Sequence, residues 1–204
     1  MAYSDFNLKK LQNNFGLIQK NTNLFEDIKP LILTDWLQQT LEMGLDLAIS
    51  SSSKKARSEF IVTPILLELR KANNNQIAIY SGENLDVDAE AGLKGECDFI
   101  LAKGERLYTI QNPIFALLEA KKNDIGSGLG QCTAQMLGAR LFNQQENNDI
   151  DTIFGCVTTG EIWQFLKLEE DVIHIDSKCY YINDLEMILG IFQNIIDYNN
   201  VTKS

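Results

Sequence analysis

The sequence of 204 residues contains little of the material from which several common functional sites are built. It has a single histidine, His174, and none of its four cysteines forms a CxxC pair, so a zinc site is not expected. No run of eighteen apolar residues occurs, which excludes a transmembrane helix and predicts no membrane partner. The N-terminus lacks a basic stretch followed by an apolar core. We therefore expect no signal peptide and a cytoplasmic location.

The cysteines lie among apolar or small neighbours, which is typical of buried thiols. Their positions are Cys97, Cys132, Cys156 and Cys179. We expect all four to be reduced and buried in a cytoplasmic protein.

Basic residues are few relative to acidic ones. The chain has 18 Lys and Arg against 28 Asp and Glu, for a formal net charge of −10. This balance counts against a protein that binds long nucleic acids through a basic surface. It does not exclude a nuclease, because a carboxylate cluster that holds cations is itself acidic. It predicts weak affinity for DNA, a short footprint or help from a partner.

Apolar periodicity predicts one α/β domain with a central mixed sheet flanked by helices, in the order helix, three strands, helix, strands, helix. Helices are expected at 34–48, 58–70, 131–142 and 185–196, and strands at 77–80, 97–102, 114–121, 153–158, 161–168 and 172–175. The segment 161–168 alternates like an edge or half-buried strand. Within residues 1–204 we separate an N-terminal helical decoration (1–52), a core (53–168) and an extra strand with a C-terminal helix (169–204).

Two of the expected strands combine apolar runs with charge. One contains Asp98, and the other ends in Glu119-Ala120-Lys121. Residues i and i+2 of a strand share a face about 6.6 Å apart, so Glu119 and Lys121 point the same way. If the strands pair, Asp98 and Glu119 lie roughly 5 Å apart. Together with the Ala120 carbonyl and water, they can chelate Mg²⁺ or Mn²⁺, which prefer oxygen ligands.

A lysine beside such a pair suits phosphodiester hydrolysis. Lys121 offsets part of the repulsion between the two carboxylates and can hold the attacking water or a phosphate oxygen. The metal lowers the pKa of the water, which then attacks phosphorus in line.

Five polar residues in this order resemble the pattern of the PD-(D/E)XK nuclease superfamily. They are Glu59, Asp98, Glu119, Lys121 and Gln131. The resemblance implies that Asp98 and Glu119 bind metal and that Lys121 is catalytic. It makes Glu59, on the helix before the sheet, an additional acidic ligand. Gln131, at the start of the next helix, matches a polar residue that some branches keep near the site.

The resemblance also implies a restriction-endonuclease-like fold. Its αβββαβ core matches the predicted element order over about 53–168. Cys97 stands where the family name has proline, a position that commonly departs from the pattern. The stretch 157–165 bears a weaker likeness to the nuclease domains of type I restriction motor subunits.

Three further segments each leave two interpretations open. The basic patch 54–57 is a solvated loop or a phosphate contact. The glycine-rich run 126–130 is a flexible connector or an anion cradle at a helix N-terminus. The acidic segment 83–90 is a solvated loop or a second cation site, because Asp86 and Asp88 share a face if the chain is extended.

The function that these features favour is a metal-dependent nuclease that hydrolyses phosphodiester bonds, with DNA as substrate. Many enzymes of the implied fold act as dimers, and a homodimer is compatible with it. The alternative is a catalytically inactive module of nuclease fold that binds a partner or nucleic acid. Hydrolysis of small phosphate compounds ranks lowest, because nothing in the sequence marks a pocket for a base.

Overall fold

The structure is a computed structural model that describes residues 1–51, 53–111, 113–148 and 150–201, without the side chain of Val201. Its elements are η1 (Tyr3–Asp5), α1 (Leu8–Phe15), β1 (Ile18–Thr22), α2 (Asp35–Ser50), α3 (Lys54–Arg57), the π-helical turn η2 (Ser58–Val62), α4 (Thr63–Ala72), β2 (Ile77–Asn84), β3 (Glu96–Lys103), β4 (Ile114–Ala120), α5 (Gly126–Gln145), β5 (Ile153–Thr158), β6 (Ile162–Glu169), β7 (Val172–Asp176), β8 (Tyr180–Tyr181), η3 (Ile182–Asp184) and α6 (Leu185–Val201). None of the helices in this part of the chain is long and apolar enough to cross a membrane.

All eight strands join one open, mixed sheet. The order is β1-β7-β6-β5-β4-β3-β2, and the short β8 pairs with β6. The pairs β1–β7 and β4–β5 are parallel, whereas the other neighbours are antiparallel. The predicted α/β class with a mixed sheet flanked by helices is confirmed.

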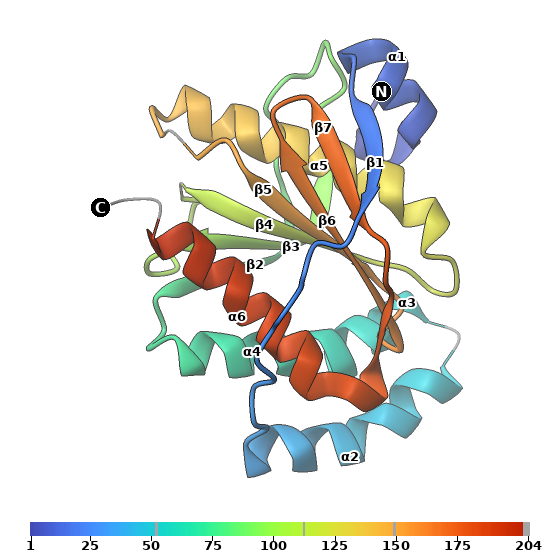
Figure 1. Cartoon of the computed structure of the whole chain (residues 1–204), viewed down its shortest axis with the longest axis vertical. Coiled ribbons are helices and arrows are strands. Elements are labelled where there is room, and N and C mark those ends of the chain that lie inside the picture. The colour runs from blue at the N-terminus through green and yellow to red at the C-terminus, as the bar shows by residue number, and fades with distance from the viewer. Residues whose placement is uncertain (52, 112, 149, 202–204) are drawn as a thin grey trace.

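Helices cover both faces of the sheet (Figure 1). On one face, α1, α5 and η1 enclose a core that includes Tyr3, Leu117 and Met136. On the other, α2, α4 and α6 enclose a core with Trp163 and Phe165. Because the central strands are covered on both sides, β4 and β5 are buried along their whole length.

A nearly continuous helical rod leads from α3 through η2 into α4. Ser53 caps its start by accepting a hydrogen bond from the Ala56 amide. Pro64 has no amide hydrogen to donate, and the π-helical turn η2 immediately precedes it. The buried Arg57 fixes the rod to the turn between β5 and β6. Its Nη1 donates to the Thr159 carbonyl and to Glu161 at 2.7 Å each.

Two expectations about strands are wrong. The segment 1–52 is not only helical, because Ile18–Thr22 forms the edge strand β1. That strand is exposed and polar, so it shows no apolar alternation; it is held by parallel pairing with β7 and by a hydrogen bond between Thr22 and His174. The segment 161–168 is expected at an edge or half-buried. Instead β6 lies inside the sheet between β5 and β7.

The glycine-rich run 126–130 is neither a flexible connector nor a loop, because it forms the first turns of α5. Close packing explains its composition. A Cβ added at Gly130 would lie 2.3 Å from Asn7 Cα and 2.6 Å from the Phe6 carbonyl oxygen. Glycine therefore lets the N-terminal segment cross directly over α5.

Three of the four cysteines are buried free thiols, as predicted: Cys97, Cys132 and Cys156. The prediction is wrong for Cys179, which is exposed. It lies just before the short strand β8, where its Sγ donates to Gln164 Oε1.

Replacing Gly130 with alanine should destabilise the fold by about 1–3 kcal/mol, because the new methyl group meets backbone atoms that cannot rotate away. Urea unfolding measures this change. Gly126→Ala is the matched control in the same helix, since its Cβ meets only the end of the Asp124 side chain at 3.2 Å. The control should change stability by less than about 1 kcal/mol. Equal effects of the two substitutions would contradict the packing argument.

Candidate active site

The pairing of β3 with β4 brings the two predicted carboxylates together. Phe99 lies opposite Leu118 and Ile100 opposite Leu117 in this antiparallel pair. The same register continued by one residue sets Asp98 opposite Glu119, on the sheet face that α5 covers. Asp98 Oδ2 also accepts a hydrogen bond from the Ala120 amide at 2.8 Å. This bond fixes one oxygen of Asp98 and leaves Oδ1 directed elsewhere.

Glu119 is a fully buried carboxylate. Its Oε2 accepts a hydrogen bond from Gln135 Nε2 at 2.9 Å. Its Oε1 accepts none, although the Nζ atoms of Lys121 and Lys54 lie 3.1 and 3.5 Å away. Buried charged groups are costly unless they are paired, so these three side chains compensate the burial of Glu119.

Lys121 is held firmly beside Glu119. Its Nζ donates to Gln131 Oε1 at 2.8 Å, so the predicted lysine and glutamine are in direct contact. Its aliphatic stem passes Gly128 of α5, where an added Cβ would lie 3.0 Å from Lys121 Cε. The helix therefore positions the lysine both through the Gln131 amide and through the missing side chain of Gly128.

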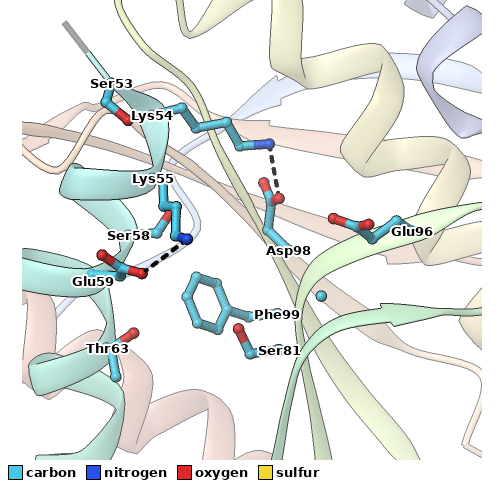
Figure 2. Close-up of a pocket in the computed structure, with 11 residues that line it drawn as sticks. Ser53, Lys54, Lys55, Ser58, Glu59, Thr63, Ser81, Glu96, Asp98 and Phe99 are labelled. Carbon is cyan, nitrogen blue, oxygen red and sulfur yellow. Dashed lines mark ion pairs between the residues drawn. The ribbon is translucent and has the colours of Figure 1, made fainter.

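Lys54 reaches the carboxylates from the opposite side. It is the first residue of α3, and its Nζ lies 2.8 Å from Asp98 Oδ1 (Figure 2). Its side chain is 42% exposed, against 14% for that of Asp98. The cluster of Asp98, Glu119, Lys54 and Lys121 thus contains two negative and two positive side chains.

Glu59 does not touch this cluster. Its carboxylate pairs with Lys55 one helical turn earlier, at 3.7 Å, and its side chain is exposed. In Figure 2 it lies across the pocket from Asp98, with Phe99 between the two. Among the residues that the structure describes, no three His, Cys, Asp or Glu side chains are grouped so that they could hold a metal ion.

A pocket of about 500 Å³ opens beside Asp98, between the α3–η2 rod and the strands β2 and β3. Its lining is rich in hydroxyl groups and includes Ser53, Ser58, Thr63 and Ser81 together with Lys54, Lys55 and Glu96. Figure 2 shows Lys54 extending from the helical wall to Asp98 on the strand wall. A ligand in the pocket would therefore lie next to the carboxylates.

The surroundings shift the pKa of two members of the cluster. Burial, and then the negative charge of Asp98, raise the pKa of Glu119, and the nearby cations offset only part of this. Burial lowers the pKa of Lys54, but its contacts with Asp98 and Glu119 raise it by more, so the net shift is upward. Lys54 is therefore a firmly charged partner of the carboxylates.

The donor atoms suit a divalent cation in their chemistry. Asp98 and Glu119 offer hard oxygen ligands of the kind that Mg²⁺ and Mn²⁺ prefer. Glu119 Oε1 makes no hydrogen bond and is approached by the ammonium groups of Lys121 and Lys54, so it has capacity for a ligand where Lys54 now lies. Lys54 already lies against both carboxylates, and Glu59 stands apart from them. The two carboxylates thus fit a metal ion if Lys54 moves away.

Sequence analysis missed the importance of two side chains. Gln135 contacts Glu119 and is fully buried; its spacing of four residues from Gln131 on one helix was the available signal. Lys54 belonged to a basic patch, but nothing in the sequence distinguished it from its neighbours Lys55 and Arg57.

The aspartates of the acidic segment 83–90 accept hydrogen bonds from nearby backbone amides. Asp86 accepts a hydrogen bond from the Gly95 amide, and Asp88 accepts one from the Ala91 amide. Asp88 also forms an isolated bridge with Leu93. These bonds tie both aspartates into the connection between β2 and β3.

No known family model matches the sequence, and no curated protein resembles it closely enough to count as a relative. Only the geometry of the site therefore indicates what the protein does.

Replacing Glu119 with glutamine should stabilise the metal-free protein at pH 8. The folded state raises the pKa of Glu119 above its ordinary value of 4.5, so folding favours the protonated acid. Below pH 4.5 Glu119 is protonated in both states, so its ionisation does not affect the free energy of unfolding. As the pH rises from 4.5 through the raised pKa, the unfolded state gains the more favourable ionisation and the protein loses stability. We expect the melting temperature to rise by about 2–4 °C at pH 8, a shift typical of one substitution in a chain of this size.

Thermal melts in a chelator at several pH values between 4 and 8 measure this difference, which should vanish toward pH 4. Glu105→Gln in the exposed loop after β3 is the control and should show no such trend. A Glu119→Gln protein that is less stable than the wild type at pH 8 would overturn the expectation.

Proposed function

We propose that this protein is a metal-dependent nuclease that hydrolyses phosphodiester bonds, with DNA as substrate. The observation that carries the proposal is the buried Glu119 carboxylate. It lies opposite Asp98 on neighbouring strands and has the Lys121 ammonium 3.1 Å away. A pocket lined by hydroxyl groups opens beside this cluster. An ion pair that served only the fold would not need a pocket beside it. Nor would it need an oxygen such as Glu119 Oε1, which makes no hydrogen bond.

The order of elements supports a restriction-endonuclease-like core of the PD-(D/E)XK type. The helix α4 is followed by β2, β3 and β4, then by α5 and β5. In this arrangement the three antiparallel strands present Asp98 and Glu119, and α5 supplies Gln131 and Gln135. The resemblance to that superfamily implies an αβββαβ core, with which this order of elements agrees.

Each side chain has a distinct part in the proposed reaction. Asp98 and Glu119 would hold a divalent cation, Mg²⁺ or Mn²⁺, which when bound activates water and stabilises negative charge on the phosphate. Lys121 is placed to orient the attacking water or to stabilise the charged phosphate oxygens. Gln131 keeps the Lys121 ammonium in position, and Gln135 holds the Glu119 carboxylate. Glu59 lines the same pocket but is paired with Lys55, so the present arrangement assigns it no part in the reaction.

The pocket gives the substrate strand a place to lie. Phosphates are commonly bound by serine and threonine hydroxyls and by lysine, all of which line it. The net charge of −10 counts against a broad basic surface, so intrinsic affinity for nucleic acid should be weak. A homodimer that presents two such sites could cut both strands of a duplex.

One observation favours a second candidate, a catalytically inactive module of the same fold. The two carboxylates are neutralised by Lys54 and Lys121 within the chain itself. Such a cluster can persist as part of the scaffold after activity is lost. The module would then bind a protein partner or nucleic acid without cleaving it.

In a nuclease assay with Mg²⁺ or Mn²⁺, Glu119→Ala and Lys121→Ala should each lower the cleavage rate at least about 100-fold, since each removes a group that acts on the reacting atoms. Single- and double-stranded DNA and RNA are tested side by side. Lys122→Ala is the matched control, because Lys122 is the exposed neighbour of Lys121 and carries the same charge. It should cleave at nearly the wild-type rate.

Cleavage that survives both Glu119→Ala and Lys121→Ala would contradict the assignment of the site. Binding of nucleic acid without any cleavage by the wild type would favour the inactive module. Faster turnover of nucleotides than of polynucleotides would indicate hydrolysis of small phosphate compounds.

A further inference from the structure

The ammonium group of Lys54 occupies the space between the two candidate metal ligands. Its Nζ lies 2.8 Å from Asp98 Oδ1 and 3.5 Å from Glu119 Oε1. These are the two carboxylate oxygens that no hydrogen bond from the backbone or from Gln135 engages. Asp98 Oδ1 and Glu119 Oε1, the oxygens best placed to bind a metal ion, thus already face the positive charge of Lys54.

We propose that Lys54 is an internal counter-ion that competes with the divalent cation, so that metal binding requires its side chain to swing away from Asp98. The inference rests on the metal site of the proposed function. Mg²⁺ binds its oxygen ligands at about 2.0–2.1 Å. An ammonium in contact with the same oxygens would be held within a few ångströms of that ion, where like charges repel strongly outside bulk water. The two cations therefore exclude each other.

The surroundings of Lys54 allow its side chain to move without disturbing the fold. Its helical rod is anchored by the buried Arg57 and capped by Ser53, so the backbone can stay in place. The Lys54 side chain itself is 42% exposed and lines the open pocket. A long lysine side chain also regains rotamer entropy when it is released.

Lys121 also lies against Glu119 Oε1, at 3.1 Å, but unlike Lys54 it is held in place by its surroundings. Its ammonium is held by Gln131 at 2.8 Å, its stem packs at Gly128, and its side chain is 20% exposed. It is therefore the lysine that stays beside Glu119 when the other leaves. Lys54 leaves on the side of the pocket, where a phosphate group of a bound strand could receive its charge.

This exchange couples the two ligands. A phosphate that draws Lys54 into the pocket removes the competitor of the metal ion, and a bound metal ion releases Lys54 to contact phosphate. Each ligand then strengthens binding of the other by the same factor. Without either ligand, Lys54 neutralises the carboxylates and limits the repulsion between them.

Calorimetric titration of the full chain with MnCl₂ alone, without nucleic acid, tests the competition. Lys54→Met should bind Mn²⁺ about tenfold more tightly than the wild type, within the usual range of coupling between two sites. Lys55→Met is the matched control, because it makes the same change of charge one residue away, on a side chain paired with Glu59 instead of the cluster. It should stay within about twofold of the wild type, because distant exposed charges are screened.

Thermal melts give an independent readout. In a chelator, Lys54→Met should melt at a lower temperature than Lys55→Met, and saturating Mn²⁺ should raise its melting temperature by more than it raises that of the control. Lys54→Ala serves as a second variant and should behave like Lys54→Met.

Equal Mn²⁺ affinity of Lys54→Met and Lys55→Met would overturn the proposal, and so would failure of Lys54→Met to bind Mn²⁺. Tighter binding by Lys54→Met in a protein that cleaves no nucleic acid would support the competition while refuting the nuclease. Cleavage that depends on Glu119, together with unchanged Mn²⁺ affinity of Lys54→Met, would support the nuclease while refuting the competition.

Discussion

The burial of one carboxylate, that of Glu119, is the constraint on which the arrangement of the site depends. A charge inside the sheet must be compensated, and elements from both sides of the molecule contribute to this. On one side α5 provides Gln135 and holds Lys121 in place through Gln131. On the other, α3 extends Lys54 across Asp98. The glycines at the start of α5 allow the close approach that these contacts need.

The two sides of the site differ in how tightly they are fixed. The α5 side is buried and close-packed, and its polar groups hold each other through hydrogen bonds. The α3 side faces the pocket and contributes an exposed lysine from a short helical segment. In the proposed function, the α5 side would position the reacting groups and the side that faces the pocket would admit the ligand.

The sequence predicted the part of this site that depends on local periodicity. Alternation along the strands placed Glu119 and Lys121 on one face, and the pairing of β3 with β4 added Asp98. Lys54 could not be assigned, because its contact depends on how the α3–η2 rod docks, which is set by Arg57 and the distant turn at Thr159. The strand β1 escaped prediction for a similar reason, since its partner β7 lies far away in the sequence.

The position of β1 has a consequence for how the chain folds. It forms one edge of the sheet by pairing with β7, which lies far along the chain from it. The central strands β3, β4 and β5 and the helix α5 are all made in between, so the interior of the sheet can assemble before this edge is closed. Contacts between such distant segments slow folding, because a long loop must close before they form. We therefore expect the pairing of β1 with β7 to be among the last contacts of the sheet to form.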